Sequence, residues 1–370
     1  MTRFCVSSLL VLALFVSSVR SLQRSPFGPS DCGVVLCEVV DQSQRADTSL
    51  LTGTRLDVDI NGNIILVDSD RNTVRLFSKA LTRTAEIGGS GWGDDQFDHP
   101  AGIWARNGID IFVADYGNHR IQRFDRKLAF ISSFSTRDRP NPDERFGYPT
   151  DVAVSRLGDL FICDSENSRI LKVIGLSKIA KTFGGFDAGK GRLHKPNQLE
   201  IGPNDNVYVQ DGKRVVVFDN FGNFIRVIGE GLFQTNVQIF SDEYGLTVLD
   251  NRKLFFFDIN DRLVFDTQLD SLLKTQQSNV RAFVFSRGVG YFVTSQGILT
   301  ATDPRVIRAA TRLEQTGTLK TVLVGKRAEV EAAAVRERIR TGGFDGSRTA
   351  PLATFPSVRP IPVSWVPPGM

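Results

Sequence analysis

Short apolar runs separated by turn residues recur along the central part of the chain. Residues 102–105 and 111–114 form one pair of runs, and residues 151–154 and 160–163 form another at a similar separation. Apolar and polar positions alternate in many of these runs, which is the two-residue period of a β-strand with one buried face. Gly158 lies in the gap of the second pair, where glycine favours a tight turn. The pattern therefore predicts a series of antiparallel β-hairpins.

These hairpins belong to a longer unit that repeats six times. The second strand of each unit ends at an anchor position, and consecutive anchors are 47, 49, 47, 39 and 45 residues apart. The anchors are Asp68, Asp115, Asp164, Asp211, Asp250 and Ser295. Four short antiparallel strands per unit at this period are typical of a β-propeller blade. Six blades closing into a ring leave no long free sheet edge, so the sequence predicts an all-β, six-bladed β-propeller.

The second unit resembles a known repeat. Residues 113–124 read Val-Ala-Asp-Tyr-Gly-Asn-His-Arg-Ile-Gln-Arg-Phe, which is similar to the consensus of the NHL repeat. Residues 88–97, followed by residues 99–103, resemble that family's connection into the next blade. The resemblance covers roughly residues 50–300 and implies a six-bladed propeller that binds a protein or another macromolecule. The family also includes a lyase with a metal in its channel, and similar propellers include calcium-dependent hydrolases, so the fold leaves the activity open.

Three polar residues recur after the second strand of the best-matched units. Asp and Asn side chains hydrogen-bond turns, and an arginine can tie adjacent strands or blades through several donors. Residues that recur from unit to unit do not define a unique site, so we interpret them as structural. The repeat positions with this role are Asp68, Asp115, Asn118, Arg120, Asp164, Asn167, Arg169, Asp211 and Asp250.

The repeat also places one residue of each unit at the start of its innermost strand, at the mouth of the central channel. These channel-mouth candidates are Arg55, Gly102, Asp151, Gln198, Val237 and Ala282. They supply one carboxylate, one amide and one cation, which makes a poor oxygen cage for calcium. His99, His119 and His194 fall short of three convergent ligands for catalytic zinc. We predict no catalytic residue, metal site or cofactor, with calcium or zinc as the alternative.

The first 21 residues have the layout of a secretory signal peptide. A short basic start precedes an apolar run over residues 4–19, and small residues suit cleavage after Ser21. No later stretch approaches 18 consecutive apolar residues, so we expect no transmembrane anchor in the mature chain. We predict export to the periplasm or the extracellular space. There Cys32 and Cys37 can pair or stay free, whereas Cys163, in an apolar strand, is expected to be a buried thiol.

The two ends of the chain differ from its centre. The predicted domains are residues 1–21 (signal peptide), 22–49 (N-terminal segment), 50–304 (propeller) and 305–370 (basic helical and Pro-rich tail). Residues 326–340 are rich in helix formers and predict a C-terminal helix. Residues 351–370 contain six prolines and predict an extended tail. The outermost strand of the sixth blade can come from residues 34–40 or 319–324, and we favour residues 34–40 because they immediately precede the first repeat.

Charge and loops complete the functional hypothesis. The chain has a net charge of +4, but residues 305–370 hold 11 basic and 5 acidic side chains, so the propeller itself is mildly acidic. This distribution argues against a nucleic-acid partner. We expect an exported, non-enzymatic scaffold that binds a protein or a cell-envelope component, with the charged loop of residues 137–145 as the best candidate patch. The alternative is a hydrolase or lyase that acts on a small molecule in the channel with a bound divalent metal.

Overall fold

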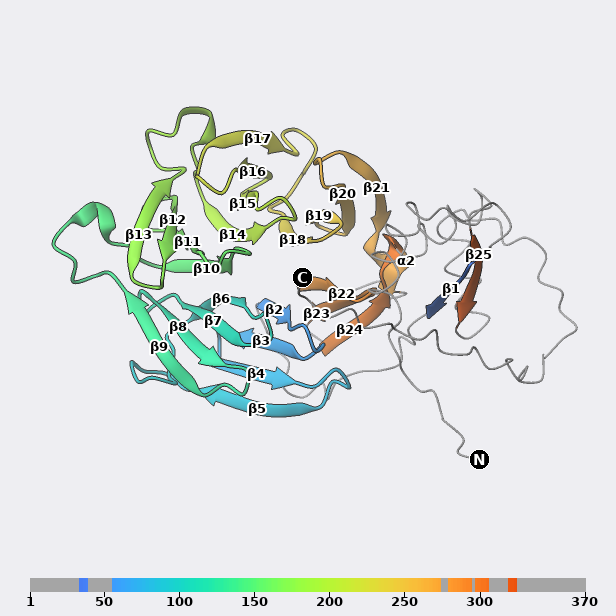
Figure 1. The fold of residues 1–370 in the computed structure, drawn as a ribbon, viewed down its shortest axis with the longest axis horizontal. Coiled ribbons are helices and arrows are strands. Elements are labelled where there is room, and N and C mark those ends of the chain that lie inside the picture. The colour runs from blue at the N-terminus through green and yellow to red at the C-terminus, as the bar shows by residue number, and fades with distance from the viewer. Residues whose placement is uncertain (1–32, 39–54, 274–278, 295–296, 306–318, 325–370) are drawn as a thin grey trace, which may run out of the picture.

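A computed structural model describes residues 33–38, 55–273, 279–294, 297–305 and 319–324 (Figure 1). Sheets of antiparallel strands are arranged as six blades around a central axis, which confirms the predicted all-β, six-bladed propeller. The innermost strands of the blades are β2, β6, β10, β14, β18 and β22, and Figure 1 shows them facing the axis. The signal peptide, the C-terminal helix and the Pro-rich tail lie outside the described residues.

The first three blades have four strands each. The first contains β2 (Arg55–Val58), β3 (Ile64–Asp68), β4 (Thr73–Phe77) and β5 (Arg83–Gly88). The second contains β6 (Pro100–Trp104), β7 (Asp110–Asp115), β8 (Arg120–Asp125) and β9 (Phe130–Ser135). The third contains β10 (Pro149–Val154), β11 (Leu160–Asp164), β12 (Arg169–Ile174) and β13 (Lys178–Phe183). The connections before and after this third blade include the short 3₁₀ helices η2 (Pro142–Glu144) and η3 (Gly189–Gly191).

The fourth and fifth blades also have four strands. The fourth contains β14 (Pro196–Ile201), β15 (Val207–Asp211), β16 (Arg214–Phe218) and β17 (Phe224–Ile228). The fifth contains β18 (Gln238–Asp242), β19 (Gly245–Asp250), β20 (Lys253–Phe257) and β21 (Leu263–Gln268), followed by the helix α2 (Leu269–Leu273). The sixth contains three strands among the described residues, β22 (Val280–Ser286), β23 (Val289–Thr294) and β24 (Gly297–Thr302).

Neither candidate segment joins the sheet of the sixth blade. Strand β1 (Gly33–Glu38) instead pairs in parallel with β25 (Leu319–Val324), in a two-stranded sheet of its own. The preference for residues 34–40 as the outermost strand beside β24 is therefore wrong. β1 and β25 supply each other's backbone hydrogen-bond partners. The two segments that we expected to be alternatives for one position in the sixth blade therefore pair with each other.

Burial follows the position of a strand within its blade. The second strands, such as β3 and β11, are buried at every position because neighbouring blades cover both of their faces. The outermost strands, such as β5 and β9, alternate between exposed and half-buried residues. One apolar cluster joins the first, fifth and sixth blades with α2, and another joins the second, third and fourth. Each blade is therefore stabilised by its neighbours.

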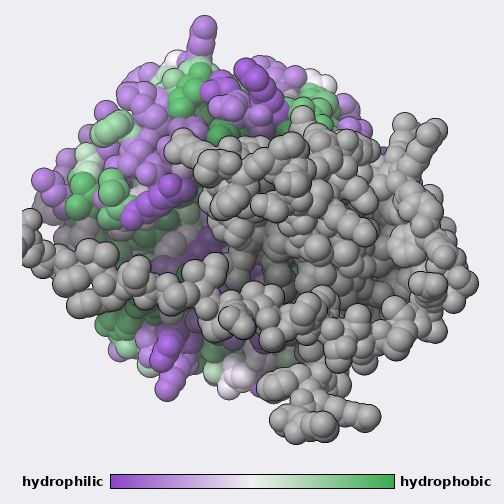
Figure 2. Space-filling model, turned by 45° about the vertical axis from the view of Figure 1, so that its right-hand side comes forward, coloured by the Kyte–Doolittle hydropathy of each residue, from purple (hydrophilic) through white to green (hydrophobic). Residues whose placement is uncertain are grey.

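The ring has two edges that carry different turns. The hairpin face carries the turn between the first and second strands of each blade and, in the first five blades, the turn between the third and fourth strands. The connection face carries the turns between the second and third strands and the links to the next blade. On the part of the surface that is coloured, hydrophilic and hydrophobic residues are interspersed (Figure 2).

Candidate functional site

The recurring Asp–Asn–Arg residues hold the connections between blades. In the second blade, Asp115 is fully buried and accepts hydrogen bonds from Arg120 Nε at 2.8 Å and Asn118 Nδ2 at 2.9 Å. Arg120 also donates through Nη1 to the carbonyl of Trp92 at 2.9 Å and through Nη2 to that of Gly93 at 2.8 Å. These carbonyls belong to the link from the first blade. The geometry supports a structural role.

The same arrangement recurs in the third blade. Asp164 accepts from Arg169 Nε at 2.9 Å and from Asn167 Nδ2 at 2.8 Å, while Arg169 Nη2 donates to the carbonyl of Arg145 at 2.7 Å. The side chain of Asp164 also accepts the backbone N–H of Gly147 at 3.1 Å.

The other anchors depart from this arrangement in particular ways. Asp68 binds Arg75 at 3.1 Å, and Asp211 binds Arg214 Nη2 at 2.8 Å. Asp250 accepts the backbone N–H groups of Gln234 at 2.7 Å and Thr235 at 2.9 Å.

The sixth anchor shifts by one residue. Thr294 pairs with Val280 in the way that Asp115 pairs with Pro100, so Thr294 takes the anchor position. Ser295, which we predicted there, lies outside the described residues.

The channel-mouth positions are set by the strand register. Each of the first four pairs with the residue before its anchor, as Asp151 pairs with Cys163. In the same way Arg55 pairs with Val67, Gly102 with Ala114 and Gln198 with Gln210.

In the fifth blade this position is taken by Gln238, which pairs with Leu249, and not by the predicted Val237. The spacing to the anchor is one residue shorter there, and Val237 packs in an apolar cluster instead. Ala282 pairs with Val293 and keeps its predicted place.

Several channel-mouth residues link neighbouring blades. A Cβ added to Gly102 would lie 2.4 Å from Asp151 Oδ1, so the second and third blades approach too closely there for a side chain. Asp151 Oδ2 accepts the backbone N–H of Leu199 at 3.0 Å. Gln198 both accepts from the backbone N–H of Ile239 at 3.0 Å and donates to its carbonyl at 3.4 Å. These side chains therefore tie blades together.

A charged cluster inside the ring was missed by the sequence analysis. Arg106, just after β6, donates through Nη2 to both carboxylate oxygens of Glu200 at 2.9 and 2.7 Å. Its Nε donates to Asp57 Oδ1 at 3.2 Å, and its Nη1 donates to the carbonyl of Ser241 at 2.6 Å. One guanidinium thus joins the first, second, fourth and fifth blades. Asp57 lies two residues after Arg55, on the same face of β2, and this alternation was an available signal.

Burial governs the protonation of this cluster. Loss of solvent raises the pKa of Glu200 to about 8, with Arg106 opposing the shift. Burial likewise raises the pKa of Asp151 to about 6, opposed by Arg55. The pKa of Arg55 is lowered by burial. The pKa of Arg106 is raised because Glu200 and Asp57 outweigh the loss of solvent.

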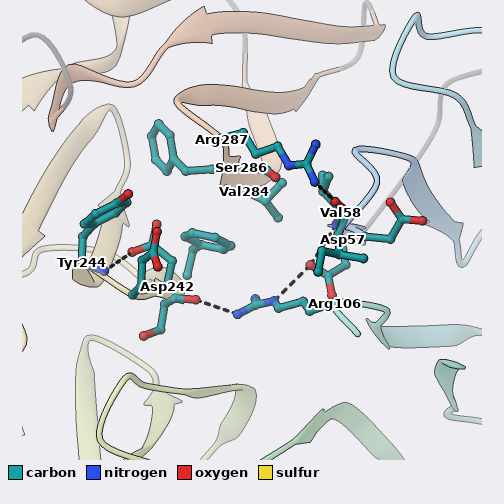
Figure 3. Close-up of a pocket in the computed structure, with 14 residues that line it drawn as sticks. Asp57, Val58, Arg106, Asp242, Tyr244, Val284, Ser286 and Arg287 are labelled. Atoms are coloured by element: carbon teal, nitrogen blue, oxygen red, sulfur yellow. Dashed lines mark hydrogen bonds and ion pairs between the residues drawn. The ribbon is translucent and has the colours of Figure 1, made fainter. Parts of the chain in front are cut away.

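A pocket of about 370 Å³ opens beside this cluster on the hairpin face (Figure 3). It lies between the first, second, fifth and sixth blades, with Arg106 and Asp57 on one side and Tyr244 and Asp242 opposite (Figure 3). Apolar side chains such as Phe240 line it as well. The pocket is therefore both charged and aromatic.

The histidines do not converge on a metal site. Nδ1 of His119 accepts the backbone N–H of Tyr148 at 3.0 Å, and its φ of 50° fits a turn position. His194 lies 2.9 Å from Arg214 Nη2, whereas His99 contacts Asp98 in a different connection. The described part of the chain contains no group of three or more His, Cys, Asp or Glu side chains that could hold a metal ion. These histidines do not fit the zinc set of a channel lyase.

The charged loop of residues 137–145 is largely paired within the chain. Arg137 forms an ion pair with Glu166 at 3.1 Å, and Arg139 forms one with Glu144 at 2.7 Å. Nε of Arg145 donates to the carbonyl of Arg139 at 2.6 Å. The loop therefore offers fewer unpaired charges than its sequence indicated.

Comparison with known proteins agrees with this geometry. The family model of the NHL repeat matches residues 146–173, which include most of the third blade. The chain carries an NHL repeat. This NHL-repeat chain is 29% identical over 140 residues to "Protein brain tumor" of Drosophila melanogaster, covering 37% of this chain and 13% of that protein. It is 37% identical over 154 residues to a "Probable peptidyl-alpha-hydroxyglycine alpha-amidating lyase" of Caenorhabditis elegans, covering 38% of this chain and 40% of that protein.

A solved structure supports the fold alone. A catalytically inactive virginiamycin B lyase from Staphylococcus aureus, with quinupristin, matches with a TM-score of 0.50 and 14% identity. The match covers 69% of this chain and 82% of that one. The chain spans less than half of the length of the Drosophila and Caenorhabditis relatives. It spans most of the length of the virginiamycin B lyase. Among the residues with a described structure, no helix is both long and apolar enough for a membrane span.

Proposed function

We propose that this NHL-repeat propeller is an exported binding module that docks a protein partner on its hairpin face, without catalysis in the channel. The observation that carries the proposal is the position of Arg106 across the channel. Its Nε, Nη1 and Nη2 all donate to protein acceptors, and two of those acceptors are carboxylates from other blades. Charged groups that bind one another in this way are used to join blades, and are not held ready for a substrate.

The hairpin face also carries exposed apolar side chains at corresponding turns. Ile60, Ile109 and Leu157 occupy the turn between the first two strands of three consecutive blades, and they are 59%, 67% and 77% exposed. Large exposed apolar residues that gather on one face mark interaction surfaces. A protein partner is the occupant that fits best, because the pocket beside Ile60 adds charged groups to this apolar arc.

The proposal is tested by affinity capture with two matched variants. The first is Ile60→Ser with Ile109→Ser and Leu157→Ser, on the hairpin face. The control is Trp92→Ser with Phe186→Ser, whose side chains are 70% and 75% exposed in the connections between blades. We expect the wild type and the control to recover the same protein from the exported fraction, and the first variant to lose it. Recovery of a glycan or lipid instead, of no partner, or of an equal amount with both variants contradicts the proposal.

A second candidate is a channel lyase, and two specific observations favour it. One is the 37% identity to the probable amidating lyase over 154 residues. The other is that Arg55 faces the channel with a weak partner, since its Nη2 lies 3.4 Å from the carbonyl of Asn197. Turnover of an α-hydroxyglycine-extended peptide by the purified chain, with and without added zinc and calcium, tests this candidate. Turnover that Arg55→Met abolishes would replace the binding proposal.

A further inference from the structure

The pocket on the hairpin face lies in a region where carboxylates outnumber guanidinium groups. Arg106 is shared by Asp57 and Glu200. On the other side, Arg305 donates to Asp242 at 2.9 and 2.7 Å and to Asp303 at 2.7 Å. Arg305 neutralises one of its two carboxylates, and Arg106 neutralises Asp57 beside a Glu200 whose pKa burial raises to about 8. The second carboxylate of Arg305 therefore leaves an excess of negative charge around the pocket.

Two further carboxylates line the pocket. Asp59 accepts the backbone N–H of Asn61 at 2.7 Å and both the backbone N–H and the side-chain Nδ2 of Asn63 at 2.8 Å, all donors of its own turn. Glu243 is exposed and has no ion pair with a described cation. Arg287 also lines the pocket and adds one positive charge, and it donates to the carbonyl of Ile60 (Figure 3). The local charge is negative even with Arg287 counted.

Aromatic rings line the same pocket and already hold guanidinium groups on its walls. The guanidinium carbon of Arg106 lies 4.8 Å from the ring centre of Phe240. That of Arg305 lies 5.0 Å from the ring of Phe285 and 5.2 Å from that of Tyr244. A cation over an aromatic face is attracted by the ring, more strongly where water is excluded. Negative charge and aromatic rings together are the chemistry of a site for an organic cation.

We propose that this pocket binds the cationic side chain of an arginine or lysine presented by the docked partner. The inference rests on the proposed function, because a protein on the hairpin face would bring such a side chain to the pocket. The bound cation lies against Glu243 and the half-buried ring of Tyr244, because the rings of Phe240 and Phe285 are 4% exposed and already hold Arg106 and Arg305. Arg287, on another wall, repels the cation and sets where it enters.

Binding of a cation should also release protons. The pKa of Glu200, raised to about 8 by burial, leaves this carboxyl partly protonated near pH 7.5. Arg106, Asp57, Asp151 and Arg55 are the charged groups that act on it. A further cation in the adjoining pocket favours the ionised form and lowers the pKa of Glu200, so a proton leaves as the cation binds.

The experiment uses the full chain and a probe that isolates the charge. N-acetyl-arginine amide and N-acetyl-citrulline amide have nearly the same shape, but only the first is a cation. Titration calorimetry at pH 7.5, in two buffers of different ionisation enthalpy, measures both affinity and proton release. We expect the arginine amide to bind with a dissociation constant of about 1–10 mM and to release protons. The citrulline amide should not bind.

Matched variants locate the site. Glu243→Lys places a cation at the pocket, and we expect it to weaken binding of the arginine amide about tenfold. Glu230→Lys makes the same charge change at an exposed residue in the connection before β18, and it should leave binding unchanged. Equal binding of the citrulline amide, or equal affinity of both variants, overturns the proposal. Thermal midpoints of both variants within a degree of wild type would show that folding is not the cause.

The two proposals fail in different ways. If the arginine amide binds as expected and affinity capture recovers no partner, the pocket is supported while the docking function fails. If a partner is captured and excess arginine amide does not displace it from the wild type, the docking function stands and the pocket proposal is wrong.

Discussion

The second and third blades are held together differently from the fifth and sixth. In the third blade, the buried Asp164 binds Arg169, and Arg169 binds the connection from the preceding blade at the carbonyl of Arg145. Between the fifth and sixth blades, aromatic rings take over: Phe240 lies 6.2 Å from Phe285, measured between ring centres. The blades that match the repeat best add charge-assisted hydrogen bonds of the repeat to their apolar contacts. Those that match least rely on aromatic packing and on Arg305, which binds Asp242 and Asp303.

The difference explains why the repeat fades along the chain while the fold continues. A blade needs a link to its neighbour, and either polar ties or apolar contacts can supply it. Where phenylalanines fill the interface, the Asp–Asn–Arg residues are no longer needed to fix it. Arg106 belongs to neither kind of link, because it reaches across the channel to Asp57 of the first blade and Glu200 of the fourth.

The largest expected effect is from Arg106→Met, which removes the link common to both regions. It leaves the buried Asp57 and the half-buried Glu200 without their cation, and breaking a buried pair in this way costs about 3–5 kcal/mol. In a propeller of this size, the thermal midpoint should fall by about 10 °C. Calorimetry checks this, with the exposed Arg156→Met as the control. An unchanged midpoint would mean that the channel cluster does not hold the blades together.

Phe285→Ala tests the aromatic packing between the fifth and sixth blades directly. Phe285 is 4% exposed, and its ring centre lies 5.8 Å from those of Phe256 and Phe292. Removing such a ring from a core costs about 3 kcal/mol or more. Denaturant unfolding should show this loss, whereas Phe221→Ala, at a residue that is 73% exposed, should cost less than about 0.5 kcal/mol. Equal effects of the two variants would refute the aromatic interface.

A matched pair of anchor substitutions sharpens the comparison. Asp164→Asn sets an amide N–H against the donors of Arg169 and removes a charge-assisted bond, at a cost of about 2 kcal/mol. Asp250→Asn loses bonds to the backbone of Gln234 and Thr235, at about 1 kcal/mol. Denaturant unfolding of both variants gives the two values. If Asp250→Asn costs as much as Asp164→Asn, the two regions rely on their anchors equally.

The blades and their polar ties could be predicted from the sequence because they repeat. The charged cluster could not, since it forms only when Arg106 and Glu200, 94 residues apart, meet across the ring. A charged residue on the channel face of a strand, such as Asp57, was the local signal. The error at Val237 came from extending a fixed spacing into a blade that is one residue shorter there. The pairing of β1 with β25 joins distant segments and has no local pattern.

The smallest expected effect on stability is from deleting residues 325–370, which belong neither to the second and third blades nor to the fifth and sixth. Each described blade buries its core against its neighbours, and Arg305, which precedes the deletion, keeps its ion pair with Asp242. The deleted residues carry a net positive charge and the propeller is mildly acidic, but exposed ion pairs contribute about 0–1 kcal/mol each and are screened by salt. The thermal midpoint should therefore fall by about 4 °C at most, less so at high salt. Loss of cooperative unfolding in scanning calorimetry would show instead that the propeller depends on this segment, and that packing between neighbouring blades is not sufficient for the fold.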